Sequence, residues 1–340
     1  MSEGPVSAAP SAAMALTSAF LWATYFFFVL AMTPGTAPSA VVTYPFLLGG
    51  TMYVVWAIYW GHGRVVAQLF RERAAWMRVG LICTMQLSVL ACTYLAGPVD
   101  TSLLALLGDA AMTPLLAMVL LREGRHRARS PEFVGGLVLA VAGATLAILA
   151  GGSAGGFRGW SLAIAPLVPL SVGLFYTLSA REGQHRPSSA VVGQATLAGG
   201  FVCLLLAGVV PGGWRGLILS GPTPILLMVG VAASSFFIAP ALYFRAVARS
   251  GIVLPALFQV MIPIFALLLS AVLLRKVPAF LGLLGVPLAV LGGFFAYRGA
   301  QTPAPPATPE AALLTEGGTL AQDAPGDPAE GRPPAVNQTR

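Results

Sequence analysis

The side chain in this sequence with the clearest capacity for chemistry is an aspartate inside an apolar segment. Asp109 lies about ten residues from either end of the apolar run 99–121, and it is the only acidic residue so deep in any such run. An ionisable group at that depth in a membrane costs several kcal/mol unless it faces a cavity or a partner. Asp109 is therefore interpreted either as a carboxylate that binds a proton or a substrate amine at the membrane midplane, or as a protonated packing residue.

Two glutamine amides are candidates for polar contacts in the same interior. Gln86 lies at the middle of the third apolar run, at a depth similar to that of Asp109, where it can hydrogen-bond the carboxyl group. Gln259 lies roughly two turns into the ninth run, between Pro255 and Pro263. Prolines inside a helix free backbone carbonyls for contact with a solute or water. Gln259 is therefore either a polar contact in a solute pathway or an interhelical hydrogen bond that holds helices together.

An indole and a guanidinium are the remaining candidates. Trp22 lies deep in the first run, where its ring can stack on a bound solute. Arg245 and Arg249 share a helix face one turn apart, at one end of the eighth run. Arg245 is interpreted either as turned inward to attract an anionic substrate or as reaching the membrane surface. Tyrosines near the ends of runs, Tyr176 and Tyr243 among them, are interpreted as belonging to aromatic belts.

These residues need a scaffold that is compatible with lipid. Of the 340 residues, 57% are hydrophobic and 9% are charged, whereas soluble proteins carry about 25% charged residues. The composition excludes a soluble enzyme, and the absence of water in hydrocarbon favours helices, which satisfy their own backbone hydrogen bonds. We expect an all-α membrane protein with ten transmembrane helices, at 12–32, 38–60, 77–96, 99–121, 132–150, 160–180, 189–210, 223–247, 252–274 and 278–298.

The basic residues indicate how these helices are oriented. A net charge of +7 would point to nucleic acid in a soluble protein, but here the arginines lie in short loops between apolar runs. With the N-terminus in the cytoplasm, twelve basic loop residues, Arg78 and Arg186 among them, fall on the cytoplasmic side and four on the other. This bias favours ten helices with both termini cytoplasmic. The Arg-, Ala- and Gly-rich composition is typical of a GC-rich bacterium, so we expect the bacterial inner (plasma) membrane and no nucleic-acid partner.

The sequence contains an internal repeat. The fourth run ends Val-Leu-Leu-Arg at 119–122, the ninth ends with the same letters at 272–275, and the following runs begin alike. Because each unit has five helices, an odd number, the second copy must insert upside down, as in inverted-repeat transporters with a site near the midplane. We expect a disordered N-terminus at 1–11, a first repeat at 12–150, a linker at 151–159, a second repeat at 160–298 and a disordered cytoplasmic tail at 299–340.

Small residues recur every four positions in the fifth and tenth helices. The two series are Gly136, Ala140 and Ala144, and Gly285, Ala289 and Gly293. Such series allow helix backbones to approach closely. They are interpreted as structural packing faces, which could also serve a homodimer interface.

This order of elements resembles the drug/metabolite transporter superfamily, EamA type. The likeness covers most of residues 12–298 and rests on the paired helix ends Leu115–Glu123 and Leu267–Lys276 and on the turn Pro263-Ile264-Phe265. Arg122 and Arg275 stand where the family has glycine, and lysine replaces the second glutamate. The resemblance implies a ten-helix exporter or exchanger of small organic solutes.

We therefore expect a secondary transporter that moves a small organic solute or metabolite across the bilayer by alternating access, with the proton as a candidate coupling ion. The chain has no P-loop motif, so a gradient or an exchange would supply the energy, and we expect no enzyme activity, metal or cofactor. Two alternatives remain. One is a non-transporting membrane scaffold or regulatory protein, and the other is an intramembrane enzyme, which would need a buried histidine or a second buried carboxylate.

Overall fold

The described part of the chain is almost entirely helical. The computed structural model describes residues 8–32, 36–122, 130–150, 163–209, 213–219, 221–275 and 280–300. About 91% of these residues are helical, and none of them forms a strand. A helix pairs its backbone N–H and C=O groups within one segment, as hydrocarbon requires. The expected all-α class is confirmed for this part of the chain.

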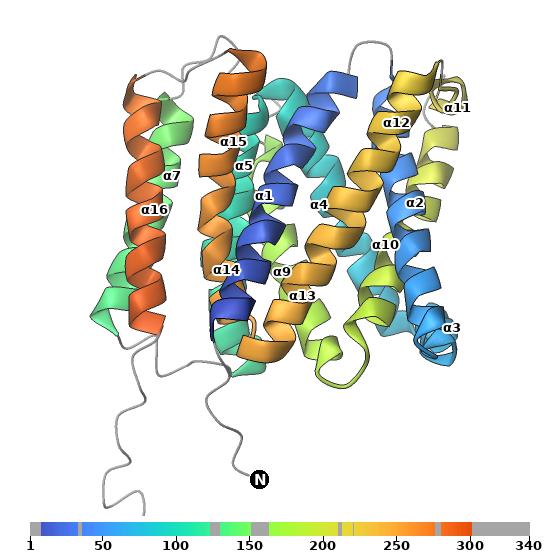
Figure 1. Ribbon diagram of the computed structural model, residues 1–340, viewed down its shortest axis with the longest axis horizontal. Helices are drawn as coiled ribbons and strands as arrows, with labels where there is room; N and C mark the ends of the chain where they lie inside the picture. Colours follow the sequence, from blue (N-terminus) through green and yellow to red (C-terminus); the bar gives the residue numbers. More distant parts are fainter. Residues whose placement is uncertain are drawn as a thin grey trace, which may run out of the picture. The chain divides into compact units, whose positions relative to one another are not determined.

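The helices follow one another with short connections (Figure 1). The first half contains α1 (Ala8–Met32), α2 (Pro38–Tyr59), α3 (Gly63–Arg71), α4 (Arg73–Leu95), the continuous series α5 (Pro98–Leu106), η1 (Leu107–Met112), α6 (Thr113–Leu116) and η2 (Ala117–Leu121), and α7 (Pro131–Ala150). The second half contains α9 (Leu167–Gly183), α10 (Ser188–Val209), α11 (Gly213–Gly216), the series α12 (Pro222–Val231), η4 (Ala232–Ile238) and α13 (Ala239–Ser250), the series α14 (Val253–Phe258), η5 (Gln259–Met261), α15 (Ile262–Leu269) and η6 (Ser270–Leu274), and α16 (Phe280–Ala300).

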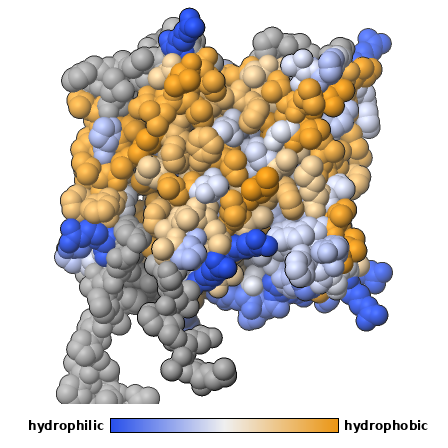
Figure 2. All heavy atoms as spheres, in the orientation of Figure 1, coloured by the Kyte–Doolittle hydropathy of each residue, from blue (hydrophilic) through white to orange (hydrophobic). Residues whose placement is uncertain are grey.

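Several of these helices are suited to lipid. Within the described ranges, seven helical segments are long and apolar enough to cross a membrane, by length and composition. Two shorter apolar stretches, Pro131–Gly143 and Leu284–Ala296, lie within α7 and α16. Figure 2 shows an apolar surface across the middle of the helices and hydrophilic residues toward their two ends. The long apolar helices indicate a protein that is embedded in a membrane.

Two details near the N-terminal end differ from expectation. Residues 1–11 were expected to be disordered, but α1 already begins at Ala8. Pro10 lies in its first turn, where the missing N–H of proline has no intrahelical partner to lose. The short α3 was not expected, because its nine residues do not form a long apolar run. Only Val66 and Leu69 of α3 are buried.

Parts of the predicted domain layout fall on residues that the structure does not describe. The linker at 151–159 lies outside the described residues, as do 301–340 of the predicted tail and 1–7 of the predicted N-terminal segment. α16 continues to Ala300, two residues beyond the predicted end of the last helix.

Two of the long helices widen into π-helical turns just before a proline. η1 precedes Pro114, and η4 precedes Pro240. Proline has no N–H, and its ring collides with the carbonyl group four residues back. After η1, the N–H of Thr113 donates to the carbonyl oxygen of Gly108, five residues back. After η4, the N–H of Ala239 donates to the carbonyl oxygen of Ser234, also five residues back. The widened turn η1 carries Asp109.

Glycines bring α7 and α16 into backbone contact in an antiparallel pair (Figure 1). A Cβ atom on Gly136 would lie 2.2 Å from the backbone nitrogen of Ala296, and one on Gly292 would lie 2.1 Å from that of Ala140. Without a hydrophobic force between helices in lipid, such close van der Waals packing holds them together. The faces of Gly136 and Ala140 are thus occupied within the chain, as the structural interpretation of the small residues predicts.

A second glycine contact joins α2 to α10, also antiparallel. A Cβ atom on Gly50 would lie 2.4 Å from the backbone nitrogen of Leu197, and one on Gly200 would lie 2.9 Å from that of Leu47. The α2–α10 and α7–α16 pairs each join one helix of the first half to one helix of the second.

The two halves also share unusual backbone positions. Gly97 before α5 and Gly251 before α14 have φ values of +101° and +74°, which favour glycine. Arg122 and Arg275, at the ends of η2 and η6, both lie in the left-handed region, with φ values of 59° and 51°. A left-handed residue commonly terminates a helix and is usually glycine. This conformation explains why glycine suits the position where this chain has arginine.

Ion pairs tie α3 and α4 to α9 and α10. Both guanidinium Nη atoms of Arg186 donate to the Glu72 carboxylate, at 2.7 and 2.8 Å, and its Nε lies 3.1 Å from Glu182. Arg78 donates to Glu182 at 3.3 Å. Arg78 was expected in a cytoplasmic loop. In the structure it lies within α4 and is buried, with 4% of its surface exposed. Its partner Glu182 offsets part of the cost of that burial.

The α7–α16 contact predicts a sharp difference between two adjacent glycines. Gly136→Ala should destabilise the protein by about 1–3 kcal/mol, because its Cβ atom meets backbone rather than a side chain that can move. Gly135→Ala is the matched control, because nothing lies within 4 Å of its Cβ position. Thermal unfolding of the purified variants in detergent measures the effect. Equal unfolding temperatures for the two variants would contradict the packing described here.

The Glu72–Arg186 pair predicts a specific acid sensitivity. Hydrogen bonds from Arg186 hold the pKa of the Glu72 carboxyl below its ordinary value of 4.5. The stability that the pair contributes is therefore present above pH 4.5 and is lost as the pH falls through the lowered pKa of the folded state. Between about pH 5 and pH 3, the unfolding temperature of Glu72→Gln should fall less than that of the wild type.

Glu132→Gln is the control for this prediction, because Glu132 is exposed in the first turn of α7 and does not belong to the ion-pair cluster. Parallel acid titration curves for Glu72→Gln and the wild type would show that the pair does not stabilise the fold.

Candidate functional site

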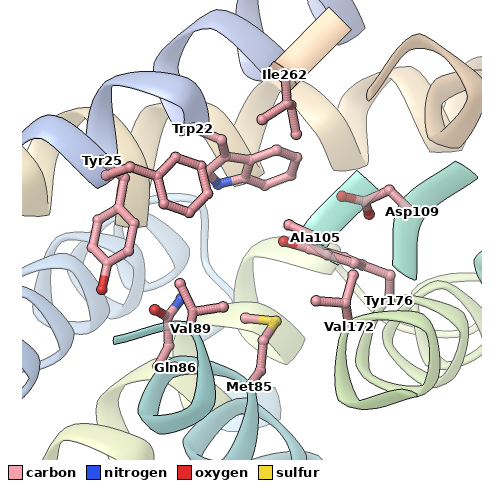
Figure 3. A pocket seen from close by; sticks show the side chains of 11 residues that line it. Trp22, Tyr25, Met85, Gln86, Val89, Ala105, Asp109, Val172, Tyr176 and Ile262 are labelled. Atoms are coloured by element: carbon pink, nitrogen blue, oxygen red, sulfur yellow. The ribbon is translucent and has the colours of Figure 1, made fainter. Parts of the chain in front are cut away.

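A cavity of about 60 Å³ lies among helices from both halves of the chain. Its volume is sufficient for about four water molecules. Figure 3 shows side chains of α1 on one side, those of α4 on another, and Asp109 and Tyr176 opposite. The lining residues are Trp22, Tyr25, Phe26, Met85, Gln86, Val89, Ala105, Asp109, Val172, Tyr176 and Ile262.

Asp109 reaches this cavity from the widened turn η1. Its side chain is 3% exposed, and its Oδ1 atom is buried without a hydrogen-bond partner. Gly108, the preceding residue, packs against Val172 of α9, where a Cβ atom would lie 2.6 Å from that side chain. This close approach places the start of η1 against α9. The structure thus places the carboxylate at a cavity, which is the condition that the first interpretation of Asp109 requires.

Trp22 is held in the wall of the cavity by contacts with η4. Its Nε1–H donates to the carbonyl oxygen of Ser235 at 3.1 Å, and the hydroxyl of Ser235 donates back to the carbonyl of Leu21 at 3.2 Å. The indole also packs against Tyr176 and Tyr243, with ring centroids 5.5 and 5.4 Å apart. Trp22 is therefore fixed in orientation, with part of its surface on the cavity.

The aromatic-belt interpretation is wrong for Tyr176 and Tyr243. Both are buried, and their ring centroids lie 5.0 Å apart in a cluster with Trp22 and Phe244. Position near the end of an apolar run does not say which way a ring points. Here the facing helices α1, α9 and α13 turn the rings toward one another.

Gln86 and Asp109 line the same cavity, but no hydrogen bond joins them. The Oε1 atom of Gln86 is buried without a partner, as is Oδ1 of Asp109. The amide nitrogen of Gln86 is the group that could donate to the carboxylate, and it makes no hydrogen bond to Asp109. The hydrogen bond that their similar depth predicted does not form in this structure.

The other two candidates lie away from the cavity. Gln259 is fully buried in η5, and its Nε2 donates to the carbonyl oxygens of Ala15 at 3.4 Å and Pro255 at 3.3 Å. It thus makes the interhelical bond of the second interpretation. Arg245 is exposed at the surface, with its guanidinium 5.2 Å above the ring of Trp56. The inward orientation of Arg245 is wrong for this structure.

Sequence reasoning missed most of the aromatic lining. Tyr25 and Phe26 come three and four residues after Trp22, so the three side chains share one face of α1. That spacing could have identified them. Tyr176 has no such signal, because its place beside Asp109 depends on how α9 packs against η1.

The site's polar groups are suited to binding a small ligand. The cavity combines one carboxylate, one amide and several aromatic rings. In the described ranges, no three His, Cys, Asp or Glu side chains come close enough together to hold a metal ion. Such a lining can bind a proton or the polar end of a small solute at Asp109 and its apolar part on the rings.

The fold has a counterpart among solved structures. No family model matches the chain, and no curated protein matches it. One crystal structure of a protein is similar, with a TM-score of 0.67 and 19% sequence identity, over 86% of this chain and 98% of the other. At this identity the likeness concerns the fold alone. The chain therefore shares its helical architecture with a known structure over nearly the whole length of that structure.

Proposed function

We propose that the protein is a secondary transporter that moves a small organic solute across the membrane by alternating access. The observation that carries this proposal is the cavity at Asp109, which is lined by residues from both halves of the chain. A buried carboxylate inside a membrane protein generally marks a substrate or ion pathway. A scaffold has no need for such a group.

We further propose ten membrane spans in two inverted repeats, the architecture of the EamA-type transporters that the sequence resembles. Three observations support it. The left-handed arginines end corresponding helices, the positive-φ glycines Gly97 and Gly251 begin them, and corresponding helices pair antiparallel through glycine contacts. An inverted repeat provides two mirror-related conformations around one central site. Alternating access follows from exchange between them.

The arginine-rich ends of the helices support an orientation with both termini in the cytoplasm, and the composition supports a bacterial inner membrane. At the arginine-rich end, ion pairs join Arg78 and Arg186 to Glu72 and Glu182. The rings of Tyr176 and Tyr243 pack against each other beside the cavity. In the proposal the ion pairs and this ring contact close the cytoplasmic side, and both separate when the cavity opens to the cytoplasm.

Asp109 is the proposed coupling residue, since its carboxyl group can hold either a proton or the solute. If one excludes the other, a proton gradient drives the exchange of a solute for a proton. The expected partners are the solute, the proton and the lipid bilayer.

Alternating access predicts that the cavity is reached from both sides of the membrane. Ala105→Cys, in a background with Cys83, Cys92 and Cys203 replaced by alanine, places a small thiol in the cavity wall. A membrane-impermeant thiol reagent should label it in right-side-out and in inside-out vesicles. Val134→Cys, exposed on the outer surface of α7, is the lipid-facing control and should be labelled from neither side. Labelling of Ala105→Cys from one side only would contradict the mechanism.

Asp109→Asn should abolish coupling while leaving the fold intact. Proteoliposomes are loaded with a mixture of amino acids, amines, sugars and organic acids, and mass spectrometry identifies the solutes that leave in a pH gradient. For those solutes, Asp109→Asn should reduce the gradient-driven flux at least about tenfold, since the amide cannot release a proton. Asp100→Asn, which removes a buried carboxylate from the first turn of α5, is the control. Unchanged flux and pH dependence in Asp109→Asn would remove this residue from the mechanism.

A further inference from the structure

The charge of the cavity has one sign. Asp109 is the only acidic residue among those that line the cavity, and the lining contains no lysine, arginine or histidine. Arg245, the arginine that could have supplied a positive charge, is exposed and stacks on Trp56 instead. An anionic ligand would therefore meet a carboxylate without a compensating cation, in a site of low dielectric where like charges repel strongly.

Three oxygens of the side chains that line the cavity are buried without a hydrogen-bond partner: Oδ1 of Asp109, Oε1 of Gln86 and the hydroxyl oxygen of Tyr25. The indole N–H of Trp22 is already used by the carbonyl of Ser235. A buried acceptor that stays unpaired costs about 1–3 kcal/mol, and more when it is charged. A ligand that brings N–H donors removes this cost.

Four of the lining residues are aromatic. The ring centroids of Trp22 and Tyr176 lie 5.5 Å apart, and Tyr25 lies beside Trp22 on α1 (Figure 3). Phe26 of α1 is the fourth. The face of an aromatic ring attracts cations, most strongly when the site is shielded from water. A cation near Asp109 would thus be stabilised by the carboxylate and by the rings together.

From this complementarity we propose that the cavity binds a small organic ammonium ion, whose N–H groups donate to Asp109 and whose hydrocarbon part lies against Trp22 and Tyr176. The volume of about 60 Å³ limits the ligand to a small one, because sites for drug-sized ligands occupy about 300–1,000 Å³. This substrate class rests on the proposed transport function, in which the ammonium ion is the solute that competes with the proton.

Three probes of nearly equal size and different charge test the proposal. They are ethylammonium, ethanol and acetate, titrated calorimetrically into the purified full-length protein in detergent, with a blank titration into detergent alone. Ethylammonium should bind, and the neutral and anionic probes should bind at least about tenfold more weakly, because they lack the charge that Asp109 attracts. This comparison uses the wild-type protein, so it does not depend on whether a variant folds.

Asp109→Asn should weaken ethylammonium binding by about 10- to 100-fold, the effect of losing a charged hydrogen-bond partner. Asp100→Asn should bind the probe as the wild type does, because Asp100 does not line the cavity. The unfolding temperature of each variant shows that it is folded. Tighter binding of ethanol or acetate, equal binding in Asp109→Asn, or no binding of ethylammonium would overturn the proposal.

The binding experiment is separate from the test of transport. If ethylammonium binds but the cavity is labelled from one side only, the ammonium site stands and the transport function fails. If the cavity is labelled from both sides but ethylammonium does not bind, the transport function stands and the substrate class is wrong.

Discussion

The structure depends on one constraint: in lipid, each backbone donor and acceptor must find its partner within the chain. Regular helices meet this constraint, but Pro114 and Pro240 each remove a donor from the middle of a long helix. The chain responds by widening the preceding turn, so that N–H groups bond five residues back. These two widened turns carry Asp109 and the Ser235 carbonyl that holds Trp22. The same adjustment that satisfies the backbone thus positions the residues of the cavity.

The cavity exists because the helices pack in two different ways. At the α7–α16 and α2–α10 contacts, glycines let the backbones touch. Between α1 and the facing helices α4 and α9, large side chains such as Trp22, Tyr176 and Met85 line a space instead. The cavity lies there, and the carboxylate of Asp109 is in its wall.

The charges of the protein are divided between two environments. Near the arginine-rich helix ends, Arg78, Arg186, Glu72 and Glu182 neutralise one another in one cluster. In the interior, Asp109 has no basic partner, and its Oδ1 accepts no hydrogen bond. Burial of an isolated charge is costly, and breaking a pair leaves the same cost behind. The paired cluster is therefore suited to holding helices together, whereas the unpaired carboxylate is suited to exchanging a proton or a ligand.

The sequence by itself determined the helical class, most helix boundaries to within a few residues, and Asp109 as the residue that needed an explanation. These follow from properties that are local in the chain: runs of apolar residues, an isolated charge and the positions of glycine and proline. Tertiary structure alone decided that Tyr176 lies at the cavity rather than in a belt, that Arg78 is buried on Glu182, that Arg245 points outward and that Gln259 bonds to α1. An apolar run in a membrane protein has little hydrophobic contrast around its circumference, so periodicity does not reveal which face meets a neighbouring helix. That choice is made by the fit between side chains from distant parts of the chain, and it becomes visible only when the helices are packed.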